Sequence, residues 1–371
     1  MNTYPIDPQY YRQQLDHKII QFKNELSRLN ITDKLPDIAI HPSAPLYYRM
    51  RAEFKIWHQA DKAHYAMHTP GIRNQPYVID DFKIASKAIN DLMPTILTAI
   101  NRCSVLRKRL FQIEFLNTMK GDMLVSLIYH KPLDENWINR VKSLRDRLDI
   151  QIVGRSRKQK IALDRDYVME HFNIANIGYD YRQVEGAFTQ PNAGINLKII
   201  EWVLANSRHF GSDLLELYCG NGNFTLPLAS HFNRVLATEI SKTAVQSANY
   251  NIKNNNIDNI TVTRMSSEDF SLAMDKVRPF RRLQDIDLDS YRFSTAFVDP
   301  PRAGLDSHTL EIIRRLDNII YISCNPMTLI ENVKRLNASH KITAMAAFDQ
   351  FPYTDHLEVG VVLKKRSAQL L

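Results

Sequence analysis

Residues 214–223 form the run Leu214-Leu215-Glu216-Leu217-Tyr218-Cys219-Gly220-Asn221-Gly222-Asn223. The mostly apolar first half is typical of a buried strand, and the glycine-rich second half opens a helix. Two glycines let the backbone approach a ligand closely, as the first strand-to-helix turn of a nucleotide-binding fold requires. From about residue 190 onward helices and strands alternate, which is the signature of a doubly wound, mostly parallel sheet. We therefore predict an α/β domain in the carboxyl-terminal half.

The ligand predicted for this loop is a nucleoside without a phosphate. The loop lacks the full G-x-G-x-x-G pattern and the terminal Lys-Ser/Thr of a phosphate-binding loop. Glu239 ends the next strand pattern about twenty residues later, where a carboxylate accepts hydrogen bonds from both ribose hydroxyls. This combination favours adenosine joined to an uncharged or cationic group, which fits S-adenosylmethionine. The alternative for Glu239 is a surface acid that ends a strand.

Two later strand patterns end on residues suited to a site. One apolar run ends at Ser323-Cys324, and Asn325-Pro326 turns the chain there. Another ends at Asp299-Pro300-Pro301-Arg302, whose prolines hold the turn stiff and fix where Asp299 and Arg302 point. Because ligands of such sheets bind at the carboxyl ends of the strands, we expect these residues to face one ligand. Taken alone, Cys324 is more simply a buried structural thiol.

The length of 371 residues exceeds what one ordinary hydrophobic core occupies, so we predict two domains, residues 1–185 and 186–371. Hydrophobic residues make up 44% and charged residues 24%, as in globular proteins. No apolar run is long enough to cross a bilayer, and the first residues lack the pattern of a secretory signal. We therefore expect a cytoplasmic protein with no membrane partner.

Cysteine content and charge narrow the classes of partner. The three cysteines, Cys103, Cys219 and Cys324, are far apart, which favours a reducing compartment and excludes a four-thiolate zinc or iron-sulfur site. Cys219 lies beside the glycine-rich loop, where packing is its best explanation. A net charge of +8 favours an anionic partner, most obviously nucleic acid.

The amino-terminal half predicts an α+β domain. Helical spacing covers about residues 8–30, 81–102 and 133–148, and strand patterns cover about 47–57, 109–116, 123–129, 150–154 and 161–163. Basic residues gather near these strands: Arg49, Arg51, Arg107, Lys108, Arg109, Arg155, Arg157 and Lys158. One interpretation is an RNA-binding platform, in which cations contact phosphates and rings such as Phe111 or Tyr47 stack on unpaired bases. The other is an ordinary sheet with a solvated charged face.

Two longer motifs carry a resemblance to a known family. The first is Asp299-Pro300-Pro301-Arg302-x-Gly304 followed by Tyr321-x-Ser323-Cys324-Asn325-x-x-Thr328, and the second is Phe348-Asp349-x-Phe351-Pro352-Tyr353-Thr354-x-His356-Leu357-Glu358. Together with residues 48–54, 188–192 and 215–223, they resemble the RNA uracil-5-methyltransferase family, and within it the members that act on tRNA. The similarity covers nearly the whole chain.

The resemblance implies a class I S-adenosylmethionine-dependent methyltransferase domain behind an amino-terminal RNA-binding domain. The implied reaction converts the T-loop uridine (U54) of tRNA to 5-methyluridine. Carbon 5 of uracil is a poor nucleophile, so Cys324 is expected to add to carbon 6 first, and Glu358 to remove the carbon 5 proton after methyl transfer. Arg302 is expected to favour the thiolate of Cys324. His356 is expected to order its loop, with proton relay as the alternative.

Further contacts are implied for the cofactor and the RNA. The cofactor contacts are expected at Gln190, Tyr218, Asn223, Glu239 and Asp299. For Asp299 the target base is an additional expected partner. Because the uridine lies in a folded loop, it must be flipped out at a cost of about a few kcal/mol. Arg51 and Phe111 are the candidates for RNA contacts that offset this cost.

Missing features select among the members of the family. The chain has too few cysteines for the iron-sulfur cluster of the ribosomal RNA relatives, and no segment matches the small β-barrel that some of them add. The expected partner is therefore tRNA, through its T-arm, with tRNA-like RNAs such as tmRNA as a second class. No metal, no iron-sulfur cluster and no obligate protein partner are expected. The open alternatives are ribosomal RNA methylation, adenine N-methylation, and a non-catalytic RNA-binding or RNA-folding protein.

Overall fold

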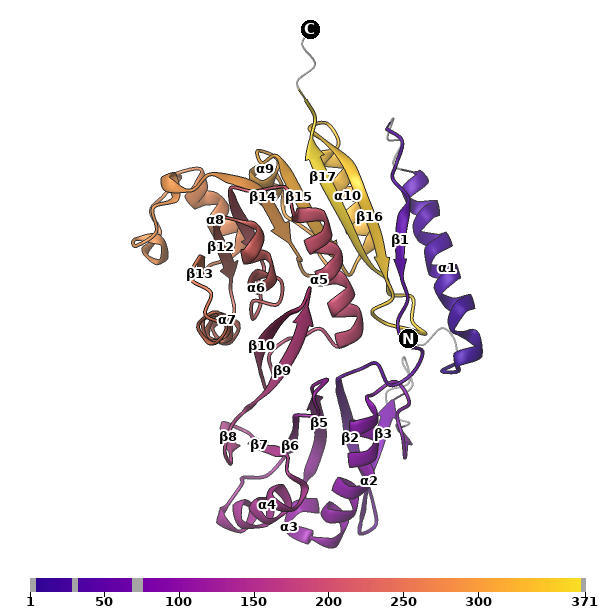
Figure 1. Ribbon diagram of the computed structural model, residues 1–371. Coiled ribbons are helices and arrows are strands. Elements are labelled where there is room, and N and C mark those ends of the chain that lie inside the picture. Colours follow the sequence, from indigo (N-terminus) through magenta and orange to yellow (C-terminus); the bar gives the residue numbers. More distant parts are fainter. Residues whose placement is uncertain (1–4, 29–32, 69–75, 368–371) are drawn as a thin grey trace.

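The computed structural model describes residues 5–28, 33–68 and 76–367 (Figure 1). In the view of Figure 1 an eight-stranded sheet flanked by helices forms the upper body, and a seven-stranded sheet forms the lower one. A two-stranded hairpin lies between them. Among the described residues, no helix is long and apolar enough to cross a membrane.

The upper sheet has the strand order β1-β16-β17-β15-β14-β11-β12-β13. Its strands are β1 (Ile38–His41), β11 (Asp213–Leu217), β12 (Arg234–Glu239), β13 (Ile260–Arg264), β14 (Phe293–Val298), β15 (Asn318–Ser323), β16 (His340–Phe348) and β17 (Glu358–Lys365). Neighbours run parallel except at β17, which is antiparallel to both β15 and β16. The strand order reverses at β11, which pairs with β12 on one side and β14 on the other. This confirms the predicted doubly wound, mostly parallel sheet, whose ligand edge is the carboxyl end of these strands.

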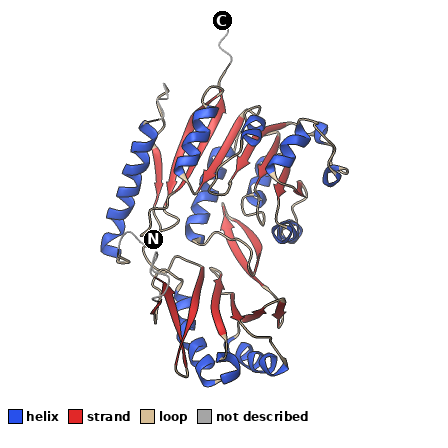
Figure 2. Cartoon of the chain, turned by 180° about the vertical axis from the view of Figure 1, so that it is seen from behind, coloured by secondary structure: helices blue, strands red, loops and turns tan. Residues whose placement is uncertain are grey.

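Helices cover both faces of this sheet (Figure 2). They are α5 (Ala193–Ser207), α6 (Thr225–Leu228) with the short η1 (Ala229–His231), α7 (Lys242–Asn254), α8 (Ser267–Met274), α9 (Ser307–Ile313) and α10 (Pro326–Leu336). Strand side chains alternate between two cores: Leu215 and Leu217 pack in the core with α8, α9 and α10, and Leu214 packs in the core with α5 and α6. The charged segment of residues 277–292 contains only the short turns η2 (Arg281–Leu283) and η3 (Leu288–Ser290).

The start of α10 fixes the backbone just after Cys324. Asn325 is the N-cap, and its side chain accepts a hydrogen bond from the backbone N–H of Met327 at 3.1 Å. Pro326 takes the first helical position, where a backbone N–H is not needed. The thiol therefore stands between a strand end and a capped helix start.

The amino-terminal helix α1 (Pro8–Ser27) packs against the upper sheet. It is shorter than the predicted helix, whose residues 29 and 30 lie outside the described residues. Its apolar stripe of Leu15, Ile19, Phe22 and Leu26 enters the same core as α10. The strand β1 then pairs in parallel with β16 at the edge of the sheet. Figure 1 shows both elements alongside the yellow strands of the carboxyl terminus.

The lower sheet has the order β4-β3-β2-β5-β6-β7-β8. Its strands are β2 (Arg51–Gln59), β3 (Lys62–His68), β4 (Pro76–Val78), β5 (Leu110–Asn117), β6 (Met123–Tyr129), β7 (Gln151–Ser156) and β8 (Gln159–Ala162), and its helices are α2 (Lys87–Arg102), α3 (Ser104–Arg107) and α4 (Glu135–Leu148). Alternate residues of β2, Ala52, Phe54 and Ile56, are buried, so this strand has one apolar face. The strand patterns predicted at about residues 109–116, 123–129, 150–154 and 161–163 form the antiparallel pairs β5–β6 and β7–β8.

The hairpin between the two sheets was not predicted from the sequence. Its strands are β9 (Tyr167–Ile174) and β10 (Ile177–Val184), and Phe172 and Tyr181 enter the core with α5. On α7, the Asn251 side chain accepts a hydrogen bond from the backbone N–H of Arg182 at 2.7 Å. The hairpin, α1 and β1 thus pack against the upper sheet although all precede residue 186, and the division at that residue stays a prediction.

Candidate active site

Cys324 follows the last residue of β15 at the ligand edge of the upper sheet and is half-buried. It lines a cleft of about 510 Å³ between α1, the first turn of α10 and residues 355–357. Arg302, from the rigid turn after β14, lines the same cleft. The thiol therefore borders a space in which a ligand can reach it.

Two carboxyl groups act on the thiol. Glu358 is the first residue of β17 and is only 3% exposed, and its neighbour Val359 pairs with Ser323, the residue before the thiol. Burial, and then the charges of Glu358 and Asp299, raise the pKa of Cys324 to about 11. In the free chain this thiol is therefore protonated at neutral pH.

Arg302 affects the pKa of Cys324 in the predicted direction, but less than burial and the two carboxyl groups do. Its charge lowers the pKa of the thiol, yet burial and the two carboxyl groups outweigh it. Its backbone carbonyl accepts a hydrogen bond from Asn325 at 3.0 Å, and its guanidinium lies 3.4 Å from Nε2 of His356. Burial and then Arg302 lower the pKa of His356, so that ring is neutral at pH 7. Arg302 thus favours the thiolate, as expected, but in the free chain its effect on the pKa is smaller than the combined effects of burial and the two carboxyl groups.

The pKa values of Asp299 and Glu358 are themselves raised. Burial raises the pKa of Asp299 to about 7. Burial, and then the charge of Asp299, raise the pKa of Glu358 well above its usual range, against the opposing effect of Arg302. Paired acids with raised pKa values gather at functional sites, because one environment must hold both protonated and ionised forms. The structure thus brings Cys324, Glu358, Asp299 and Arg302 together at one edge.

The glycine-rich loop after β11 has a shape that lets a ligand lie close to its backbone. Gly220 and Gly222 have φ angles of +57° and +86°, and a Cβ on Gly222 would lie 2.7 Å from a methyl carbon of Leu226. Glu239 accepts hydrogen bonds from the N–H groups of Gly220 at 3.1 Å and Ser241 at 2.7 Å, one on each oxygen. A carboxylate has about four acceptor positions, so Glu239 can also accept from two ribose hydroxyls. These residues fit an adenosine ligand.

Gln190 links the segment between β10 and α5 to the acids. Its amide nitrogen donates to Asp299 at 3.4 Å, and its amide oxygen accepts from Gln350 at 2.7 Å. The structure therefore brings Gln190 and Asp299 together, as the resemblance implies. Gln350, which is fully buried, was not singled out from the sequence.

The remaining predicted cofactor residues flank the loop. Asn223 exchanges two amide hydrogen bonds of 2.8 Å with Asn196 of α5, and the Tyr218 hydroxyl is hydrogen-bonded to Ser267 at 2.5 Å. Glu216 in β11 was missed, although a glutamate inside an apolar strand is a visible signal. It is fully buried, and burial raises its pKa to about 8, with Asp299 adding to the rise. Cys219 packs in the core with α5, as predicted.

A buried ion pair holds the segment before Glu358 against α1. Nζ of Lys18 donates to Asp349 at 2.7 Å and to the carbonyls of Phe351 at 2.8 Å and His356 at 2.9 Å. Gln14, one turn earlier, donates to the other oxygen of Asp349 at 2.8 Å. Lys18 is 3% and Asp349 0% exposed. These contacts of Lys18 and Gln14 clamp the loop to α1. Because the loop leads directly into β17, this clamp sets where that strand begins.

The two predicted RNA contacts lie in different places. Arg51 donates to the carbonyl of Ala187 at 2.7 Å, in the segment between β10 and α5. Phe111 lies five residues before Leu116, the partner of Arg51 in the sheet, which is about 17 Å along the strand. The structure does not bring Phe111 to the cleft of Cys324. Phe188, beside Ala187, is 74% exposed and was not named as an RNA contact from the sequence.

The comparisons with known proteins agree along the whole chain. A family model described as tRNA (uracil-5-)-methyltransferase matches residues 10–366. The chain is 51% identical over 361 residues to a tRNA/tmRNA (uracil-C(5))-methyltransferase of Aromatoleum aromaticum, covering 97% of each chain. It is 58% identical over 321 residues to one of Teredinibacter turnerae, covering 86% of this chain and 88% of that one.

One solved structure supports the fold. The tRNA (uracil-54, C5)-methyltransferase of Pyrococcus abyssi, crystallised with S-adenosyl-L-homocysteine, matches with a TM-score of 0.71 at 20% identity, over 95% of this chain and 83% of that one. Over the described residues, no three His, Cys, Asp or Glu side chains are grouped to hold a metal ion.

Proposed function

The chain belongs to the tRNA (uracil-5-)-methyltransferase family, and on that premise we propose that it methylates carbon 5 of the T-loop uridine (U54) of tRNA. The observation that carries this proposal is the thiol of Cys324 beside Glu358 and Asp299 at the sheet edge. Since relatives carry the name tRNA/tmRNA (uracil-C(5))-methyltransferase, tmRNA is the second proposed substrate. The cytoplasm is the proposed place of action.

S-adenosylmethionine supplies an electrophilic methyl group on a positively charged sulfur. Glu239 is proposed to hold its ribose, and the backbone of Gly220 and Gly222 to lie against the nucleoside. Tyr218, Asn223 and the Gln190–Asp299 pair would surround the rest of the molecule. The raised pKa of Asp299 fits a bound cation, which would stabilise the carboxylate form.

Cys324 is proposed to activate the base. Its proton leaves to solvent, the sulfur forms a bond to carbon 6, and the electron pair of the C5=C6 bond moves to carbon 5. Because the pKa of Cys324 is about 11, only about one thiol in ten thousand is ionised at pH 7 in the free chain. A cation bound near Glu358 and Asp299 would offset the charges that suppress the thiolate.

Glu358 is proposed to complete the reaction. After methyl transfer, carbon 5 carries both the new methyl group and its original proton. The Glu358 carboxylate takes that proton, the C5–H electron pair re-forms the C5=C6 bond, and the bond from carbon 6 to Cys324 breaks to release a thiolate. Because Glu358 must be ionised at this step, its raised pKa has to fall when the ligands bind.

The uridine must leave its stack to reach Cys324. Flipping a base costs about a few kcal/mol, which contacts to the flipped nucleotide and its neighbours offset. The exposed ring of Phe188, two residues from Gln190, is a suitable stacking surface, and Arg51 holds this segment through Ala187. Phe111 stays a candidate for RNA farther from the flipped base.

A methyl-transfer assay tests the proposal. Radioactive S-adenosylmethionine and a tRNA transcript without modified bases should give labelled 5-methyluridine with the wild type and none with Cys324→Ala. Label in adenine, with full activity in Cys324→Ala, would indicate adenine N-methylation. Label in ribosomal RNA but not tRNA would change the substrate. RNA binding by the wild type without any transfer would leave a non-catalytic RNA-binding protein.

A further inference from the structure

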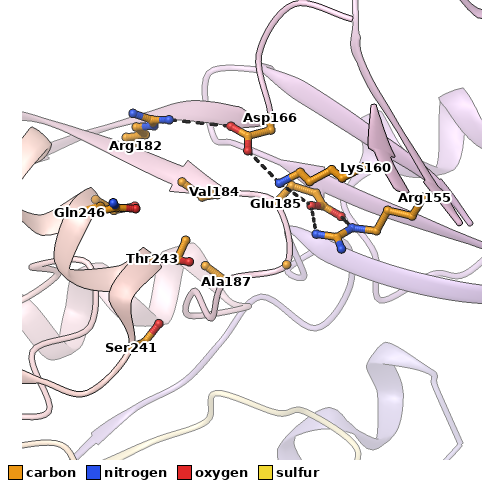
Figure 3. A pocket seen from close by; sticks show the side chains of 12 residues that line it. Arg155, Lys160, Asp166, Arg182, Val184, Glu185, Ala187, Ser241, Thr243 and Gln246 are labelled. Atoms are coloured by element: carbon orange, nitrogen blue, oxygen red, sulfur yellow. Dashed lines mark hydrogen bonds and ion pairs between the residues drawn. The ribbon is translucent and has the colours of Figure 1, made fainter. Parts of the chain in front are cut away.

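A second cavity, of about 460 Å³, lies between the lower sheet and α7 (Figure 3). Its walls come from β7 and β8, from the end of β10 and residues 185–187, and from the first turns of α7. No residue that lines the cleft of Cys324 also lines this cavity, so the two cavities are distinct. Both bodies of the protein contribute to it, which suits a ligand that spans them.

One wall is a chain of ion pairs (Figure 3). Arg155 donates to both oxygens of the buried Glu185 at 2.6 Å. Lys160 lies 3.2 Å from Glu185 and 2.7 Å from Asp166, and Arg182 lies 3.7 Å from Asp166. Three cations thus meet two carboxylates, a net charge of +1. Because both acids are already bound by cations, the unshared charge and the remaining N–H donors are left for an anion.

The opposite wall is the amino-terminal end of α7, where Thr243 and Gln246 lie across the cavity from these ion pairs. The helix has 13 residues, and the first N–H groups of a helix attract anions. Ser247 also lines the cavity; it is 2% exposed, and its hydroxyl finds no hydrogen-bond partner in the described part of the chain. Nε of Arg182 is likewise buried and without a partner there. Buried donors of this kind are normally satisfied, so they indicate a ligand.

We propose that this cavity binds a backbone phosphate of the RNA substrate. Cations, hydroxyls and a helix amino terminus converge on it, which is the chemistry of a phosphate site. Ala187 lines the cavity and lies three residues before Gln190, which is hydrogen-bonded to Asp299. An RNA strand that delivers its uridine to that edge passes this segment, so a nearby phosphate can enter the cavity. The inference rests on the proposed function and adds a contact that fixes the strand between the two bodies.

Two substitutions test the site by charge. Thr243→Glu places a carboxylate in the cavity at the second residue of α7, where an acid favours the helix, so the thermal unfolding midpoint should not fall. Lys160→Gln removes one cation. With an unmodified tRNA transcript, each should raise the Kd by about three- to tenfold near 100 mM salt, and Lys160→Gln should reduce the slope of log K against log salt by about 0.7–0.9. The KM for tRNA should rise with the Kd.

Arg314→Gln is the matched control. Arg314 is an exposed arginine, also paired with a carboxylate, Glu311 at 3.0 Å, and it precedes the amino end of β15 at the opposite edge of the sheet. Its Kd and salt slope should equal those of the wild type. If Thr243→Glu and Lys160→Gln also bind tRNA with unchanged Kd and slope while the wild type methylates it, the phosphate site is wrong and the proposed function stands.

A second experiment distinguishes a site for an RNA backbone phosphate from a site for a small phosphate compound. Inorganic phosphate and AMP are titrated into the wild type and Thr243→Glu at constant ionic strength. Weak binding of both, together with the loss of tRNA affinity, supports the proposal. If either binds below about millimolar Kd in the wild type only, and tRNA affinity is unchanged by the substitutions, the cavity serves a small phosphate compound and the RNA assignment is overturned. A wild type that transfers no methyl group to any RNA refutes the proposed function instead.

Discussion

Lys18→Met removes the cation that holds α1 to the loop before β17. Methionine keeps the length and the helix propensity of lysine but cannot donate a hydrogen bond. The change leaves Asp349, which is fully buried, without its ion-pair partner, and it removes the Lys18 donor from the carbonyls of Phe351 and His356. The Phe351 carbonyl keeps the hydroxyl of Thr354 as a donor at 2.8 Å. Gln14 remains as one donor to Asp349 at 2.8 Å.

The magnitude follows from the burial of both partners. Removing one member of a buried ion pair costs about 3–5 kcal/mol, because an uncompensated charge stays in the interior. At about 2–4 °C per kcal/mol, the unfolding midpoint should fall by roughly 6–20 °C. The methyl-transfer rate should fall as well, because the clamp sets the start of the strand that carries Glu358.

Arg12→Met is the control on the same helix. Arg12 pairs with Asp16 one turn away at 3.0 Å, but the two side chains are 75% and 47% exposed, so the loss should be within about 1 kcal/mol. The double variant Lys18→Met with Asp349→Asn removes both charges and should recover most of the stability. Thermal and urea unfolding with bound S-adenosyl-L-homocysteine report all three. A Lys18→Met loss no larger than that of Arg12→Met would refute the reasoning.

Four other outcomes are expected. Glu358→Gln should trap the RNA adduct on Cys324, seen as a retarded band in a denaturing gel, and normal release of methylated RNA would contradict the assigned roles. Iodoacetamide should alkylate Cys324 of the free chain with a midpoint near pH 11, lower in Glu358→Gln and higher in Arg302→Ala, because an acid raises and a cation lowers the pKa of a thiol; a midpoint near pH 8.5 would show no perturbation. Gly222→Ala should cost about 1–3 kcal/mol and weaken S-adenosyl-L-homocysteine binding, since φ is +86° and the new Cβ meets a leucine methyl at 2.7 Å; wild-type affinity would exclude this. Binding of S-adenosylmethionine at pH 7 should release protons, because a cation lowers the raised pKa values of Asp299 and Glu358. Calorimetry in buffers of different ionisation enthalpy measures this release. No released protons would mean that the two acids are already ionised in the free chain.

Local pattern was enough to predict the central strands of the upper sheet. Each of its central strands is a short apolar run that ends on a glycine, proline or polar residue, so both the strand and the site residue after it are visible in the sequence. Asp299 and Cys324 follow parallel strands, whose carboxyl ends share one edge. Glu358 joins them there because it begins β17, which runs antiparallel to β15, so its amino end lies at the same edge.

Contacts between distant segments could not be predicted in this way. Lys18 and Asp349 are separated by 331 positions, and a lysine in an amphipathic helix gives no sign that it will be buried. The strand β1 has four residues and no alternation of its own, and its place beside β16 depends on the sheet being present. The distance between Arg51 and Phe111, about 17 Å along the strand, depends on the pairing register of β2 and β5, which the composition around either residue does not give.

The excess of acidic groups at the ligand edge would make the proposed methyl donor and the proposed nucleophile, Cys324, depend on one another. Glu216, Asp299 and Glu358 are carboxyl groups with raised pKa values, and Arg302 is a cation that acts on both Glu358 and Cys324. Such a site is costly for the free chain, and a ligand with a positive sulfur lowers that cost while a neutral thioether product does not. The same positive charge offsets the acids that keep Cys324 protonated. On the proposed roles, the thiolate would therefore become accessible when the methyl donor is bound, and without the donor the protonated thiol would be a poor target for oxidation and alkylation.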